Sequence, residues 1–271
     1  MSLSFNHDFA PEPERPETIA PLVRRIVAAN PGLYTFRGTN TYVLGEGSLA
    51  VIDPGPEDFA HVGAILAATK GERIERILLT HSHRDHCGAV ELLREASRAD
   101  IAPLRAGESL YLGECRLLAI ATPGHASDHL CFALEGSDLL FTGDHVMGWS
   151  TSVIAPPDGA MADYLASLEL LLARRERLYL PGHGAAIEEG PEFARGLIAH
   201  RKAREAAILV LLEKHDHSIP EIVSLLYAGI DPGLIRGAGL SVLAHLEHLI
   251  ARQMLISEGP VSLTARYRLA I

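Results

Sequence analysis

The sequence predicts an α/β protein in two parts, a sandwich of sheets and helices followed by a small α+β module. Three observations lead to this fold class. Short apolar strands alternate with helical stretches through residues 40–180, and the polar residues able to carry chemistry stand directly after strands. Beyond Pro181 the pattern changes to helices with apolar faces and one short hairpin. We place the boundary at residue 197, which gives domains 1–197 and 198–271.

The residues before position 40 are polar and proline-bearing, and we predict a loose start there. Eight strands are expected from short runs rich in Val, Leu, Ile and Tyr between turn residues, at 40–44, 48–52, 77–79, 109–112, 116–121, 129–134, 139–142 and 178–180. Three helices are expected from apolar periodicity, at 57–69, 89–97 and 160–174. The first should carry acidic residues in its first turn, where the helix dipole favours them. This order suggests helices packed outside two sheets.

The second part contains three predicted helices, at residues 193–213, 219–227 and 240–252. Pro220 suits the first turn of the second helix, and Leu243, Leu246 and Ile250 share one face of the third. A small hairpin follows, at 254–257 and 266–269. Three helices followed by a two-stranded wing are the layout of a winged-helix module.

Bulk composition limits the function classes. A net charge of −10 argues against a strongly nucleic-acid-binding surface, because such surfaces are usually basic. Three cysteines are too few and too scattered for a disulfide framework. No uncharged apolar run approaches the roughly 18–20 residues that cross a bilayer, and the start lacks signal-peptide features. We therefore expect a cytoplasmic protein without a membrane partner.

The strongest functional signal is a loop directly after the strand at 77–79. It carries His81, His83, Asp85 and His86, four metal-capable side chains within six residues. In an extended loop, residues two apart point the same way, so His81 and His83 can bind one ion, while Asp85 and His86 face a neighbouring position. A single histidine would be read as a core residue, but a cluster of this density indicates a metal site.

Three glycine-supported loops each add one further candidate ligand after a strand. They are Thr122-Pro123-Gly124-His125, Thr142-Gly143-Asp144 and Pro181-Gly182-His183-Gly184. Glycine lets the backbone turn tightly enough to aim the side chain. Each loop alone is a weak signal, but their order behind the histidine cluster is specific.

Together these motifs resemble the metallo-β-lactamase superfamily over roughly residues 37–190. The resemblance implies the αβ/βα sandwich of that family, with His81, His83 and His125 at a first metal, Asp85, His86 and His183 at a second, and Asp144 bridging them. Asp53 resembles the family's aspartate that steadies the histidine loop. True lactamases of this fold usually lack the bridging aspartate, so the ligand set resembles the thioester- and phosphodiester-cleaving branches instead.

The chemistry expected from these ligands is hydrolysis by a hydroxide shared between two ions about 3.5–4 Å apart. Mixed histidine and carboxylate ligands favour two zinc ions, with iron or manganese as alternatives. Asp85 or Asp144 would accept the proton, and the residues alone do not separate these catalytic roles. For His129 and His145 we favour structural or supporting positions over substrate contact, and we interpret Cys87 as a buried thiol and Trp149 as packing. For Tyr164, contact with the cleft stays as open as packing.

The substrate is less determined than the reaction. The last 75 residues or so resemble the winged-helix-like tail of lactamase-like hydrolases, a group that includes single-strand RNA endoribonucleases. This resemblance favours a phosphodiester such as single-stranded RNA. The alternative is a small thioester, as in glyoxalase II, although the basic residues that hold glutathione there have no convincing equivalent here. A non-catalytic nucleic-acid-binding module is the third and weakest hypothesis.

Overall fold

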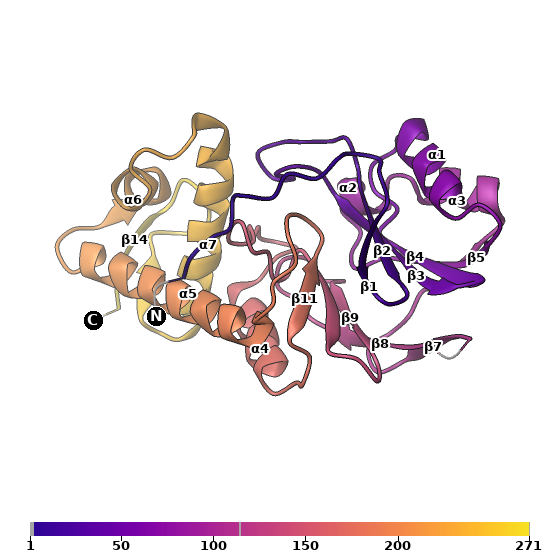
Figure 1. Cartoon of the computed structure of the whole chain (residues 1–271). Coiled ribbons are helices and arrows are strands. Elements are labelled where there is room, and N and C mark those ends of the chain that lie inside the picture. Colours follow the sequence, from indigo (N-terminus) through magenta and orange to yellow (C-terminus); the bar gives the residue numbers. More distant parts are fainter. Residues whose placement is uncertain (1–2, 114, 271) are drawn as a thin grey trace.

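Two β-sheets face each other in the first part of the computed structural model, which describes residues 3–113 and 115–270 (Figure 1). The first sheet contains β1 (Glu17–Ala20), β2 (Val23–Val27), β3 (Asn40–Glu46), β4 (Ser48–Ile52), β5 (Arg73–Leu78) and β6 (Asp100–Ile101), in that order. The second runs in the order β11 (Leu178–Pro181), β10 (Leu139–Gly143), β9 (Leu130–Leu134), β8 (Cys115–Ala121) and β7 (Ser109–Leu112). The pairs β4–β5, β5–β6 and β10–β11 are parallel.

Helices cover the outer face of each sheet, and this confirms the predicted sandwich (Figure 1). They are α1 (Phe59–Ala68), α3 (Val90–Ser97), α4 (Met161–Leu172) and α5 (Gly190–Leu212), whereas the single turn α2 (Arg84–Cys87) lies within the histidine loop. Side chains alternate across each strand: on β3, Tyr42 points between the sheets and meets Phe141 with ring centroids 5.1 Å apart, whereas Val43 points outward to α1 and α3. Residues of β8, β9 and β10 pack on the other side against α4 and α5.

The C-terminal module has its own apolar core around Tyr267 and Leu246, and it confirms the predicted winged helix. It contains α6 (Ile219–Leu226), the 3-10 turn η1 (Pro232–Leu234), α7 (Ile235–Ala251) and a sheet of β12 (His217–Ser218), β14 (Arg266–Leu269) and β13 (Leu255–Ser257). The wing therefore has three strands, because β12 adds to the predicted hairpin. The boundary predicted at residue 197 falls inside α5, which contributes to the cores of both parts.

Residues Pro232–Ala251 are long and apolar enough to pass a test for a membrane-crossing helix, with a mean hydropathy of 1.2, but half of the tested window is buried inside the protein. Core helices of soluble proteins pass the same test. We therefore read α7 as the central helix of the C-terminal module.

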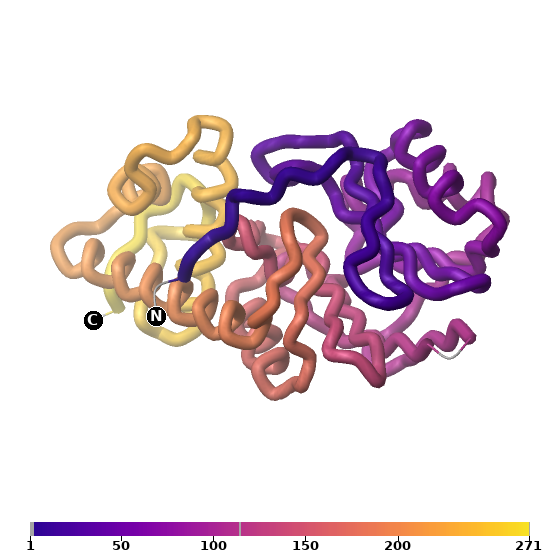
Figure 2. Tube along the Cα trace, viewed as in Figure 1, coloured from indigo at the N-terminus to yellow at the C-terminus, as the bar shows by residue number. Residues whose placement is uncertain are grey.

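The start of the chain differs most from the prediction. β1 and β2 form an antiparallel pair at the edge of the first sheet, where arginines interrupt the apolar pattern but are held by ion pairs, Arg24 with Glu72 and Arg25 with Glu17. Before them, the N-terminal segment runs alongside the sandwich to α5 (Figure 2). There Phe5 packs on Phe193, with ring centroids 6.2 Å apart. These contacts join distant segments, so the local pattern could not reveal them.

Helix α1 begins two residues later than predicted. Its first turn contains no acidic residue, which makes that detail of the prediction wrong. Asp58 instead precedes the helix in an extended conformation, and its side chain accepts a hydrogen bond from the Ala60 N–H at 2.8 Å. The carboxylate thus caps the first backbone donors rather than standing inside the turn.

Candidate metal centre

The predicted ligands gather where strands of both sheets end. Loops after β5, β8, β10 and β11 deliver them, and all seven side chains meet in two adjoining groups. The first group consists of His81, His83 and His125, and the second of Asp85, His86, Asp144 and His183. Within each group the candidate ligand atoms lie within 4.8 Å of one another. The structure therefore brings together every residue that the sequence proposed as a ligand.

In the first group, three imidazole nitrogens converge on one point. His83 Nδ1 lies 2.9 Å from His81 Nε2 and 3.0 Å from His125 Nε2. Lone pairs that face each other at such distances need either a proton or a cation between them. Three histidine nitrogens around one position are a common zinc ligand set.

In the second group, the carboxylates of Asp85 and Asp144 face the imidazoles of two histidines, His86 and His183. Asp85 Oδ2 lies 3.3 Å from His183 Nε2 and 3.6 Å from His86 Nε2. Asp144 Oδ1 lies 3.4 Å from the same two nitrogens. Its other oxygen, Oδ2, lies 3.7 Å from His125 Nε2 in the first group. One carboxylate thus faces both groups, the arrangement required of a bridging ligand.

Unpartnered polar atoms support metal binding at the second group. His86 Nε2, His183 Nε2 and Asp144 Oδ1 are buried, and beyond their ion-pair contacts of 3.4 Å with one another they have no hydrogen-bond partner among the described residues. Gly182 leaves space beside them, because a Cβ there would lie 2.6 Å from both Asp144 Oδ1 and His86 Cε1. Buried polar atoms normally find partners, so this donor set fits a divalent cation.

The electrostatics separate the two groups. Burial lowers the pKa of His81 well below its usual value and also lowers that of His125, so both imidazoles are neutral. Burial acts in the same direction on His183, but Asp144 and Asp85 outweigh it and raise its pKa to about 9. Burial would raise the pKa of Asp144, yet His183 and His86 hold it well below the usual range. In the absence of metal, the second group is a buried network of ion pairs.

Asp53 fixes the histidine loop, as the sequence predicted for it. Its Oδ1 accepts the Thr80 N–H at 2.7 Å, and its Oδ2 accepts the Thr80 hydroxyl at 2.7 Å and lies 2.9 Å from His86 Nδ1. The Thr80 oxygen in turn lies 3.0 Å from His81 Nδ1. With Nδ1 donating to Asp53, the Nε2 lone pair of His86 is directed at the cluster.

The remaining histidines and aromatic residues surround the centre. The Asp144 N–H donates to His129 Nε2 at 3.2 Å, which gives His129 a supporting position. His145 is buried with both ring nitrogens unpartnered among the described residues, 4.8 Å from the Tyr164 ring, and Tyr164 is itself buried. Trp149 stacks on Phe36 with ring centroids 4.8 Å apart. Cys87 donates to the Ser82 carbonyl at 3.2 Å and is not part of either cluster.

A cavity of about 470 Å³ opens on the metal centre. His83, Asp85, His125 and Asp144 form its floor. Its walls come from both parts of the chain, and they include Tyr34, Met147, Val153, Ala155, Arg236 and Leu240. The sequence did not predict Tyr34, Arg236 and Leu240 at this cavity, because these residues reach it only through packing of the two parts.

Comparison with protein families decides the classification. Residues 34–114 and 98–183 match the model described as "Metallo-beta-lactamase superfamily". The chain belongs to the metallo-β-lactamase superfamily. Residues 218–259 match a second model, the "Beta-lactamase associated winged helix domain". With the His/Asp clusters in place, the chain is a metal-dependent hydrolase of this superfamily.

Relatives in the superfamily have two kinds of name. The chain is 30% identical over 243 residues to "Lactamase-like protein adaB" of Aspergillus niger, covering 79% of this chain and 75% of that protein. It is 32% identical over 228 residues to an "Atrochrysone carboxyl ACP thioesterase" of Claviceps purpurea, covering 78% of this chain and 71% of that protein.

Solved structures agree on the architecture. A metallo-β-lactamase family protein from Thermus thermophilus superposes with a TM-score of 0.78 at 25% identity, over 93% of this chain and all of that chain. A β-lactamase domain protein from Burkholderia ambifaria superposes with a TM-score of 0.85 at 21% identity, over 97% and 96% of the two chains. The second likeness shows that the fold includes the C-terminal module.

Proposed function

We propose that this metallo-β-lactamase superfamily member hydrolyses thioesters, with two zinc ions at the histidine and aspartate clusters. The observation that carries the proposal is the cavity on the metal centre. Met147, Val153, Ala155 and Leu240 give it apolar walls, which suit an acyl chain. The relatives named as acyl carrier protein thioesterases support the same substrate class. We infer that the thiol portion is an arm of the phosphopantetheine type.

The same observations favour a thioester over single-stranded RNA, the substrate that the sequence placed first. In helix-turn-helix modules, the recognition helix reads nucleic acid with an exposed face. Here most of α7 is buried, including Gly237, Ala238 and His245, and its N-terminal residues Arg236, Gly237 and Leu240 form a wall of the cavity. The net charge of −10 gives no general attraction for a phosphate backbone.

The protein's own groups suit an acyl transfer to water. When bound, two ions would polarise the thioester carbonyl and lower the pKa of the attacking water. Asp144, 9% exposed, stays a carboxylate between the two groups and fixes their spacing. Asp85, whose side chain is 31% exposed, lines the cavity and can pass a proton to solvent. The apolar walls hold the acyl chain and limit access of bulk water.

The test is hydrolysis of N-acetylcysteamine thioesters by zinc-loaded protein, measured as the rate at which free thiol is released. We expect turnover that a chelator abolishes and that falls at least about a hundredfold in Asp144→Asn, since one bridging ligand is weakened. Lactoylglutathione and labelled single-stranded RNA serve as parallel substrates. RNA cleavage with no thiol release from either thioester would overturn the proposal and restore the phosphodiester hypothesis.

A further inference from the structure

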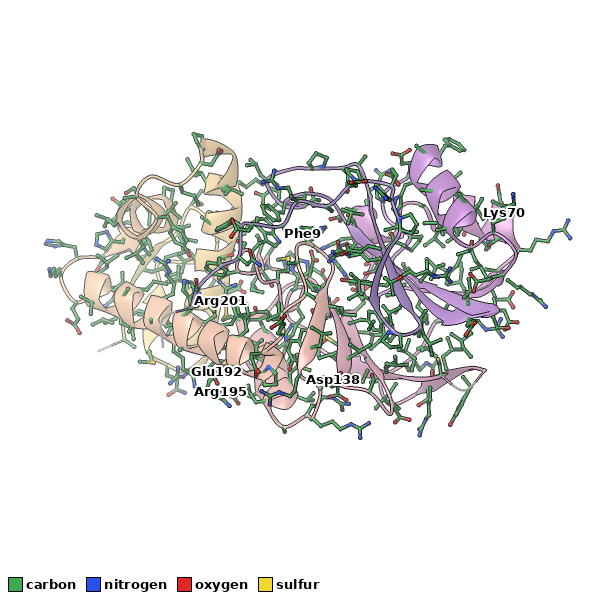
Figure 3. The ribbon with its side chains drawn as sticks, in the orientation of Figure 1. Phe9, Lys70, Asp138, Glu192, Arg195 and Arg201 are labelled. Carbon is green, nitrogen blue, oxygen red and sulfur yellow. The ribbon has the colours of Figure 1, made fainter. Side chains whose placement is uncertain are left out.

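A second, smaller cavity of about 110 Å³ lies beside the metal cavity. Tyr34, Val153 and Gly237 line both. The polar residues of the smaller cavity that matter for its chemistry are His200 and Arg201, both from α5. Figure 3 places Arg201 on the side of α5 that faces the body of the molecule, while Glu192 and Arg195 lie on the outer side.

Arg201 is a buried cation for which the described part of the chain supplies no counterion. Its exposed fraction is 2%, and no carboxylate among the described residues lies within 4 Å of its guanidinium nitrogens. Its Nη2 donates to the Ser152 carbonyl, and its Cζ lies over the Tyr164 ring, 5.2 Å from the ring centroid. Its Nε has no hydrogen-bond partner among the described residues. Burying a charge without compensation is costly. An anion beside the Arg201 guanidinium would offset this cost.

The carboxylate of Glu205 is near Arg201 in the sequence but is already paired with other side chains. Glu205, one turn further along α5, lies 2.7 Å from His248 Nδ1, 3.3 Å from His245 Nδ1 and 3.7 Å from Arg252. At the same cavity, burial and the charges of Arg201 and Arg204 lower the pKa of His200 to about 4, so its ring is neutral. Its Nδ1 is a second unpartnered polar atom at this cavity.

We propose that the small cavity binds an oxyanion, a carboxylate, sulfate or phosphate group, through the Arg201 guanidinium. The cavity also adjoins the metal loop. Ser152, whose carbonyl receives Arg201, donates its hydroxyl to the Asp144 carbonyl, and the Val153 carbonyl lies 2.6 Å from His125 Nδ1. An anion there offsets the buried charge of Arg201, which donates to the loop at Ser152. The bound anion therefore stabilises the loop that supports the two metal ligands Asp144 and His125.

The first test is thermal unfolding of zinc-loaded protein in sulfate, compared with chloride at equal ionic strength. At about 100 times the dissociation constant we expect sulfate to raise the Tm of wild type by about 5 °C. Arg201→Gln should lose this rise. Lys202→Gln, the same charge change on the next and largely exposed residue, should keep it. Equal rises in all three proteins would overturn the proposal.

A second test needs no variant, in case Arg201→Gln does not fold. Wild-type crystals soaked in selenate should show an anomalous peak within hydrogen-bond distance of the Arg201 guanidinium, separate from any peak at the metal centre. Water alone in this cavity, with selenate bound elsewhere, would contradict the site.

The oxyanion could be free in solution or belong to the substrate, and kinetics distinguishes these sources. The kinetic experiment rests on the proposed thioesterase activity, whereas the sulfate-binding experiments do not. If the substrate supplies the anion, Arg201→Gln should lower kcat/KM for a succinyl thioester at least tenfold more than for a butyryl thioester. If the anion is free, both substrates should be affected equally, with the sulfate effect on Tm retained in wild type.

Discussion

At the residue scale, each histidine of the metal centre has one ring nitrogen directed at the cluster, and most have the other fixed by a neighbour. His125 Nδ1 lies 2.6 Å from the Val153 carbonyl, and His183 Nδ1 lies 3.1 Å from the Gly38 carbonyl. His81 and His86 depend on the chain through Thr80 to Asp53. The supporting acceptors therefore define which nitrogen can bind metal.

Asp53→Asn tests this dependence. The amide cannot accept all three hydrogen bonds that the carboxylate takes from Thr80 and His86. We expect zinc affinity, measured by competition with a chelator, to fall about 10–100-fold. Asp138→Asn makes the same chemical change on an exposed turn and should leave the affinity unchanged. An unchanged affinity in Asp53→Asn would show that the network does not orient the ligands.

His145 sets a dependence of stability on acid. Burial lowers the pKa of His145 from 6.5 to about 3. Below pH 6.5 the imidazole is therefore protonated in the unfolded chain but stays neutral in the folded chain. Stability is therefore lost as the pH falls from 6.5 towards 3. By this linkage, metal-free His145→Leu should lose about 2 kcal/mol less unfolding free energy than wild type between pH 7 and pH 5. Denaturant titrations at both pH values measure it, and equal losses would contradict the buried neutral imidazole.

The ligands were predictable from sequence because their signals are local. His81 to His86 form one loop, and each later ligand stands in a turn with glycine after a strand. The positions of Tyr34, Arg201 and Arg236 were not predictable as site residues. They reach the cavities through packing of α5, α7 and an N-terminal loop, and nothing in their neighbouring residues encodes that contact.

At the element scale, strand ends determine where chemistry can occur. β4 and β5 are parallel, as are β10 and β11, so the loops that follow them leave the sheets at one edge. Apolar runs with turn residues revealed most of these strands. They did not reveal β1 and β2, because Arg24 and Arg25 hide the pattern and only distant carboxylates explain them.

The start of α1 offers a prediction at this scale. Asp58→Ala removes the side chain that accepts the Ala60 N–H, and the free energy of unfolding should fall by about 1 kcal/mol. Glu57→Ala, one residue earlier, removes only an exposed ion pair with Arg84 and should cost much less. Urea denaturation compares the two. An equal cost for both changes would contradict the assignment of Asp58 as the cap.

At the scale of the whole molecule, the cavity on the metal centre belongs to neither part alone. The sandwich supplies its metal-bearing floor, and α7 of the C-terminal module supplies Arg236, Gly237 and Leu240 as one wall. Under the proposed function, the module forms part of the substrate pocket, and the start of α7 lies at the cavity on the metal centre.

Leu240→Asp tests the acyl-binding role of this wall. A charge in place of an apolar side chain should raise KM for long acyl thioesters, with a loss that grows with chain length because each buried methylene contributes about 0.8 kcal/mol. Zinc content should stay that of wild type, since Leu240 is not in either ligand cluster. Equal kinetics for short and long chains in wild type and variant would place the acyl group elsewhere.

Native mass spectrometry of the purified protein is the sharpest test of a two-metal centre built from seven side chains. We expect two zinc ions per chain in wild type and no more than one in Asp144→Ala, since Asp144 faces both groups. A metal-free protein that is fully stable and hydrolyses its substrate in the presence of a chelator would contradict it.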